Sequence, residues 1–95
     1  MDPLVKAVGE PTRLRICADL QRHRGEQRMV DLIHRLNPRH HYQVRHHARM
    51  LADAGVVRVR KAVDGMHVET LIELTAAGKA ALRQWRDELQ EVVAG

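Results

Sequence analysis

The sequence predicts a small, mainly α-helical domain that carries one β-hairpin. Apolar residues recur every three to four positions up to Gly55, as they do along amphipathic helices. After Gly55 the period changes to two in the runs VVRVRKAV and HVETLIEL, and the Asp64-Gly65 pair between them is a strong hairpin signal. Helical periodicity returns after Thr75. A chain of 95 residues suits one such domain, which we expect to span residues 1–95.

The first two predicted helices lie on either side of the Gly9-Glu10-Pro11 break. PLVKAVG predicts a short helix before it. Pro11 suits the first position of the next helix, because proline lacks an N–H that a helix start leaves unpaired in any case. This second helix is expected to end at Gly25. Its apolar face is predicted to hold Leu14, Ile16, Cys17, Ala18 and Leu20.

The third and fourth helices are separated by Asn37-Pro38. In RMVDLIHRLN, the residues Val30, Ile33 and Leu36 stand at helical spacing, with Leu32 beside them. Asn37-Pro38 then predicts an N-cap followed by proline at the first position of the fourth helix. We expect that helix to end at Gly55, since glycine is common just past a helix C-terminus.

The fourth helix is predicted to have an apolar side and a basic side. Val44, Ala48 and Leu51 fall at i, i+4 and i+7 and so form one stripe. At about 100° per residue, polar and basic side chains occupy or flank the opposite side. These residues are Tyr42, Gln43, Arg45, His46, Arg49 and Asp53.

The hairpin and the last helix complete the predicted order. In the second strand Val68, Thr70, Ile72 and Leu74 share a face, and His67, Glu69 and Glu73 point away. Thr75 is predicted to cap a final helix that carries Ala81, Trp85, Leu89 and Val92 along one stripe. Four helices, a hairpin and a further helix are the layout of a winged helix-turn-helix domain.

Positive charge is concentrated in the middle of the chain. Residues 38–67 contain six Lys/Arg against two Asp/Glu, together with five of the seven histidines. Residues 68–95 contain three Lys/Arg against five Asp/Glu. Such a basic segment is typical of a surface that binds a polyanion. Tyr42 and Trp85 are the only aromatic residues, so a base-stacking platform for single-stranded nucleic acid is not expected.

Other classes of protein find little support. The longest apolar runs are far below the ~20 residues that span a bilayer, and the N-terminus does not resemble a signal peptide. Cys17 is the only cysteine, which excludes an internal disulfide and suits a cytoplasmic protein. The sequence lacks a Gly-x-Ser-x-Gly elbow, a phosphate loop and a His-Glu-x-x-His pair. We therefore expect neither an enzyme nor a cofactor.

Three segments resemble bacterial winged-helix transcriptional regulators of the ArsR and MarR kind. LVKAVGEPTRLRI is similar to the ArsR opening, although Glu10 stands where that family often has an aspartate cap. VRHHARMLADAGVVRVRK resembles the recognition helix and first wing strand, with Arg45 and Ala48 in place of the usual serine and leucine. LTAAGKAAL resembles the start of the last helix in MarR-like proteins. The resemblance covers nearly the whole chain.

The resemblance implies a homodimeric repressor that binds a pseudo-palindromic double-stranded DNA operator, with one recognition helix in each half-site. The residues expected at the DNA are Arg39, His40, His41, Tyr42, Gln43, Arg45, His46, Arg49, Arg58, Arg60, Lys61 and His67. The first and last helices are expected to form the dimer through Leu4, Val5, Val8, Leu82, Trp85, Leu89 and Val92.

Two alternatives remain open from the sequence. Some ArsR relatives sense metals, but His40, His41, His46 and His47 include no pair at the three- or four-residue spacing that suits one helix. A zinc site shared between subunits, using His34, His40 or His41, is the remaining form of that hypothesis. The second alternative is a winged-helix module that docks on a protein, for which the basic middle segment is not required.

Overall fold

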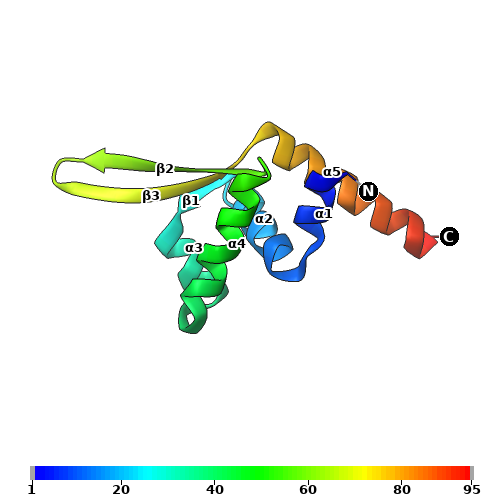
Figure 1. Cartoon of the computed structure of the whole chain (residues 1–95), viewed down its shortest axis with the longest axis horizontal. Helices are drawn as coiled ribbons and strands as arrows, with labels where there is room; N and C mark the ends of the chain where they lie inside the picture. Colours follow the sequence, from blue (N-terminus) through cyan, green and yellow to red (C-terminus); the bar gives the residue numbers. More distant parts are fainter. Residues whose placement is uncertain (1, 95) are drawn as a thin grey trace.

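The computed structural model describes residues 2–94 and has the predicted winged helix-turn-helix fold (Figure 1). Five α-helices and a three-stranded sheet make up the described residues. In chain order the elements are α1 (Pro3–Gly9), α2 (Pro11–Arg22), β1 (Glu26–Arg28), α3 (Met29–Leu36), a 3₁₀ turn (Pro38–His40), α4 (His41–Asp53), β2 (Val57–Asp64), β3 (His67–Leu74) and α5 (Ala76–Ala94).

The sheet is antiparallel, with β3 between β1 and β2. β2 and β3 pair from Val57 opposite Leu74 to Asp64 opposite His67, and their far end extends beyond the helices (Figure 1). The loop is Gly65-Met66, one residue later than the predicted Asp64-Gly65 break, because Gly65 takes a φ of 61° at the first loop position. The sequence did not predict β1, since a three-residue strand is too short to show a period.

The core lies between the helices and one face of the sheet. The predicted stripe of Val44, Ala48 and Leu51 is confirmed, because all three residues are buried. In α3 the predicted helix is confirmed, and Val30 lies on its exposed side, with an exposed fraction of 58%. This helix begins at Met29, and its phase turns Met29, Leu32 and Ile33 inward instead. The core residues are Val5, Val8, Ile16, Cys17, Leu20, Met29, Leu32, Ile33, Val44, Ala48, Leu51, Val56, Val57, Ile72, Leu74, Ala81 and Leu82.

The turn between α3 and α4 differs from the prediction. Asn37 makes no side-chain capping hydrogen bond, and Pro38–His40 form a single 3₁₀ turn. His40 then adopts φ −128° and ψ 53°, outside the helical region, so that α4 begins only at His41. The prediction of a helix start at Pro38 was therefore wrong, because this extra turn of chain redirects the backbone before α4.

The start of α5 is held by the predicted cap. The Thr75 Oγ1 atom accepts a hydrogen bond from the Gly78 N–H at 2.9 Å. The same hydroxyl lies 2.6 Å from the Gly55 carbonyl oxygen and 3.0 Å from that of Val56. Thr75 thereby joins the end of α4 to the start of α5 across 20 positions of sequence. No helix within residues 2–94 has the length and hydropathy that a membrane span requires.

Candidate nucleic-acid interface

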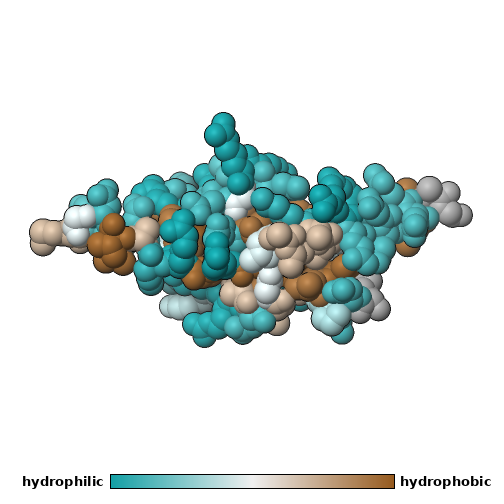
Figure 2. Space-filling model, turned by 90° about the horizontal axis from the view of Figure 1, so that it is seen from above, coloured by the Kyte–Doolittle hydropathy of each residue, from teal (hydrophilic) through white to brown (hydrophobic). Residues whose placement is uncertain are grey.

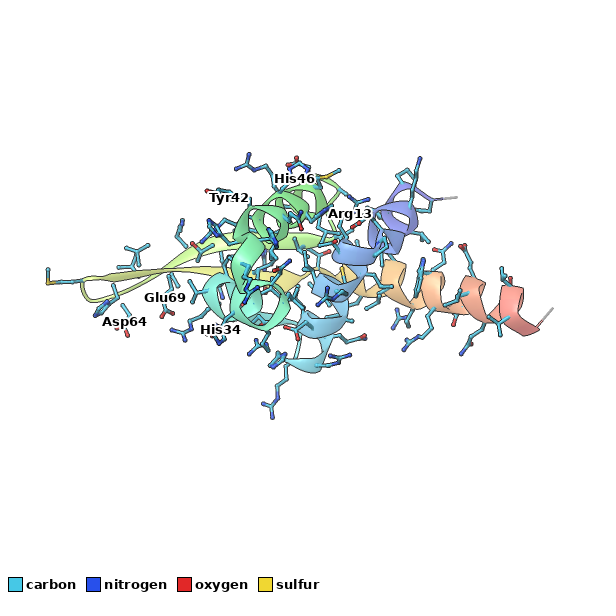
Figure 3. All side chains as sticks on the ribbon, turned by 90° about the horizontal axis from the view of Figure 1, so that it is seen from below. Arg13, His34, Tyr42, His46, Asp64 and Glu69 are labelled. Carbon is cyan, nitrogen blue, oxygen red and sulfur yellow. The ribbon has the colours of Figure 1, made fainter. Side chains whose placement is uncertain are left out.

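The exposed side of α4 carries a row of hydrogen-bonding and cationic side chains. Tyr42, Gln43, Arg45, His46 and Arg49 are all exposed, opposite the buried stripe of the same helix. Figure 3 shows Tyr42 and His46 projecting from the same side of α4, whereas His34 of α3 lies on the other side of the molecule. The Tyr42 ring packs against that of His41, with centroids 4.2 Å apart. This arrangement leaves one face of α4 free to enter a groove.

A groove between α4 and the wing brings cations from two elements together. Arg45 and Arg49 of α4 line it from one side and Lys61 of β2 from the other. The Lys61 Nζ donates a hydrogen bond to the Thr70 hydroxyl at 2.6 Å, which holds the amine on this face of the hairpin. Three cations along one groove suit the negatively charged backbone of a nucleic acid.

The structure does not bring Arg58 and Arg60 to this groove. Side chains alternate along a strand, so both arginines lie on the face of the sheet opposite Lys61. The Arg58 Nε donates to the Glu73 carboxylate at 2.6 Å, and the Arg60 Nη2 donates to that of Glu26 at 2.9 Å. The hydrogen bond from Arg58 lowers the pKa of Glu73, so the carboxylate stays charged. These ion pairs already neutralise the two arginines that we expected near phosphates.

The remaining residues expected at DNA flank these surfaces. Arg39, His40 and His41 are exposed in the turn that leads into α4, beside its N-terminus. His67 begins β3, where it pairs with Asp64 next to the loop of the hairpin. The turn residues are therefore continuous with the exposed side of α4. His67 lies on the same face of the sheet as Arg58.

A polar cluster that the sequence did not reveal fixes α4 against α1 and α2. The Arg13 Nε donates to the Ala7 carbonyl at 2.6 Å, and its Nη1 lies 3.3 Å from the His47 Nδ1. The same Nδ1 is 3.5 Å from the Glu10 carboxylate. His47 therefore serves as a hydrogen-bonded packing residue. No local pattern reveals Arg13, because 34 positions separate it from His47.

Glu10 also caps α2, in the place where an aspartate is common. Its carboxylate accepts a hydrogen bond from the Arg13 N–H at 2.8 Å. Burial raises the pKa of Glu10, but the backbone N–H groups of Arg13 and Thr12 and the charge of His47 outweigh it, and the net shift is downward. The carboxylate is thus held in its charged form at the junction of α1, α2 and α4.

The residues expected at a dimer interface divide into two groups. Val5, Val8 and Leu82 are buried inside the chain itself, because α1 packs between α2 and α5. Leu4 and Trp85 are partly exposed, and Leu89 and Val92 are exposed on the part of α5 that extends past α1 (Figure 1). A partner subunit could reach only this second group without opening the core.

The structure also bears on metal binding. Within residues 2–94, no three His, Cys, Asp or Glu side chains are grouped in a way that could hold a metal ion. His34 lies in α3, and His40 and His41 lie in and after the 3₁₀ turn, all exposed to solvent. Cys17 is buried, and burial raises the pKa of its thiol to about 12. The buried Cys17 thiol is therefore uncharged near neutral pH.

Comparison with known proteins shows the family to which the chain belongs. The model of a helix-turn-helix domain family matches residues 8–60, which is more than half of the chain. The crystal structure of Bacillus subtilis PadR in complex with operator DNA is similar over 76% of this chain, with a TM-score of 0.58 and 21% sequence identity. The aligned region covers 45% of the PadR chain, so this protein spans less than half of that length. No curated protein matches the sequence.

Proposed function

Because the chain belongs to the helix-turn-helix domain family, we propose that it is a transcriptional regulator that binds double-stranded DNA sequence-specifically. The observation that carries this proposal is the exposed side of α4, with Gln43, Arg45 and Arg49 opposite a fully packed stripe. The similar PadR structure, which was solved with operator DNA, supports the same use of the fold.

In the proposed complex α4 lies in the major groove, since a helix of ~10–12 Å diameter fits a groove ~12 Å wide. Arginine can bridge O6 and N7 of guanine, and glutamine can pair with N6 and N7 of adenine. We propose that Arg45, Arg49 and Gln43, which are exposed on α4, make such contacts, with Tyr42 and His46 beside them. In this proposal Lys61, which lines the groove beside α4, holds a phosphate, and so do the exposed residues Arg39, His40 and His41 at the start of α4. Arg58 and Arg60 are left out of this set because of their ion pairs with Glu73 and Glu26.

We further propose a homodimer of the ArsR/MarR kind, formed from single-domain chains of residues 1–95 in the cytoplasm. The exposed apolar positions of α5, Leu89 and Val92, together with Trp85, give a surface that a second copy could cover. Two copies related by a two-fold axis would read a pseudo-palindromic operator and repress by occluding the promoter.

Selection of bound duplexes from a random pool tests this proposal. The selected sequence is then titrated by fluorescence anisotropy with wild type, Arg45→Ala, Arg49→Ala and the control Arg58→Ala. Each lost base contact is expected to cost ~1–3 kcal/mol and to relax the preference at one base pair. Arg58→Ala is expected to leave the affinity close to that of wild type, because its partner is Glu73. Binding of the operator by an Arg45→Ala/Arg49→Ala variant as tightly as by wild type would refute the assignment.

A further inference from the structure

The end of the wing is apolar, and this apolar surface is unusual for a proposed DNA-binding hairpin. Met66 is 99% exposed, and the paired residues Val63 and Val68 are 72% and 64% exposed. Residues 62–69 contain two carboxylates and no Lys or Arg. Figure 2 shows apolar side chains at this far end of the molecule. The wing tip therefore has no permanent cation with which to hold a phosphate.

The apolar side chains lie on the same face of the hairpin as the cationic groove. In the strand register Val63 pairs with Val68, two positions beyond the Lys61–Thr70 pair, so all four residues share one face. The carboxylates Asp64 and Glu69 alternate with them and lie on the opposite face. Val68 and Thr70 line a hollow together with Arg45, and this hollow adjoins the groove with Lys61, so this face of the wing continues from the exposed side of α4.

The distance along the wing matches the spacing of the grooves of DNA. Met66 stands five residues beyond Lys61, which is roughly 16 Å at ~3.3 Å per residue. Neighbouring major and minor grooves are half a turn apart, roughly 17 Å along an axis with a ~34 Å repeat. Lys61 lines the groove beside α4, so with α4 in the major groove the tip stands about half a turn away, at the adjacent minor groove.

Resting on the proposed function, we infer that Met66 inserts into the minor groove as an apolar wedge, with Val63 and Val68 against the sugars. Methionine is one of the side chains that proteins place between base steps, where it partly unstacks them and kinks the duplex. A flexible, unbranched thioether fits such an irregular gap. The wing of this chain then contributes through apolar contact and DNA deformation, and the salt-dependent attraction comes from α4 and Lys61.

The test compares variants of Met66 on the duplex selected by wild type. Met66→Gln keeps the length of the side chain and makes it polar, Met66→Leu keeps it apolar, and Lys61→Ala is the control for a phosphate contact. Met66 is almost fully exposed, so none of its substitutions is expected to change the unfolding temperature. Affinity is measured by anisotropy between 50 and about 200 mM salt, the range over which phosphate contacts change affinity strongly. Unstacking is measured by fluorescence of 2-aminopurine placed in the minor-groove step.

We expect Met66→Gln to weaken binding about tenfold per subunit, because burial of one such apolar side chain contributes about that much to affinity. The slope of log affinity against log salt concentration should not change. The 2-aminopurine signal should fall with Met66→Gln and persist with Met66→Leu. Lys61→Ala should instead reduce the salt slope by about one and keep the 2-aminopurine signal. If Met66→Gln binds and unstacks like wild type, the wedge is wrong although the proposed function stands. If Met66→Gln changes only the mass in light scattering, the tip is a contact between protein copies. A wild type that binds no duplex overturns both proposals.

Discussion

Replacing Gly78 with alanine is expected to destabilise the fold, although alanine is the better helix former. Gly78 lies in the first turn of α5, and a Cβ built on it would stand 2.0 Å from the Val56 carbonyl oxygen and 3.1 Å from the Val56 Cγ1. That oxygen cannot move freely, because it accepts hydrogen bonds from the Thr75 N–H at 3.0 Å and is 3.0 Å from the Thr75 hydroxyl.

The magnitude follows from three contributions. Overpacking of a closed site costs ~1–3 kcal/mol. Weakening the hydrogen bonds to Val56 costs roughly 1 kcal/mol more. Against this, alanine gains about 1 kcal/mol over glycine within a helix. The free energy of unfolding should therefore fall by about 2 kcal/mol.

Urea unfolding followed by the fluorescence of Trp85, the only tryptophan, measures this change. Gly9→Ala is the matched control. A Cβ at Gly9 would stand 2.9 Å from the Trp85 Nε1, but a partly exposed side chain can move away, whereas a fixed carbonyl cannot. Gly9→Ala should thus cost clearly less than Gly78→Ala. A Gly78→Ala protein that unfolds at the same urea concentration as wild type, or at a higher one, would refute the steric argument.

Three further predictions concern acid stability, zinc and dimerisation. The pKa of Glu10 is lowered in the folded chain from an ordinary value of 4.5, so its contribution is present above pH 4.5 and is lost as pH falls through the folded pKa. Glu10→Gln should therefore lower the unfolding temperature at pH 7, because losing the helix cap costs about 1 kcal/mol. The difference in unfolding temperature between this variant and wild type should shrink below pH 4.5. Stoichiometric zinc should leave DNA affinity unchanged, because within residues 2–94 no three His, Cys, Asp or Glu side chains are grouped in a way that could hold a metal ion. A strong zinc effect that chelator reverses would favour the metal-sensing alternative. Light scattering at micromolar concentration should give a dimer for wild type and a monomer for Trp85→Arg, and a monomeric wild type would contradict the proposed assembly.

The local sequence determined the order of the five helices and the hairpin, but it did not reveal the three-residue strand β1. The stripe of Val44, Ala48 and Leu51 predicted which side of α4 is buried, because periodicity along a helix depends only on spacing. Thr75 and Gly65 predicted a cap and a turn, since side-chain capping and a positive φ are properties of a few adjacent residues. The predicted helix start at Asn37-Pro38 was wrong because it also rested on adjacent residues alone. Asn-Pro is a common start of a helix, but here the chain forms a 3₁₀ turn before α4 begins.

Only the tertiary structure decided which cations face the same way. Arg58, Arg60 and Lys61 are nearly adjacent in sequence, yet they lie on different faces of the sheet. Lys61 lies beside α4, whereas Arg58 pairs with Glu73 and Arg60 pairs with Glu26 on the opposite face. Likewise, Arg13 and His47 meet because α2 packs on α4, and no spacing along the chain encodes that contact. A single sequence states the period of each element, whereas the face that meets a distant element depends on packing between segments far apart in the chain. The sequence therefore predicted that the candidate interface is basic, but it did not predict which of the cationic side chains lie on it.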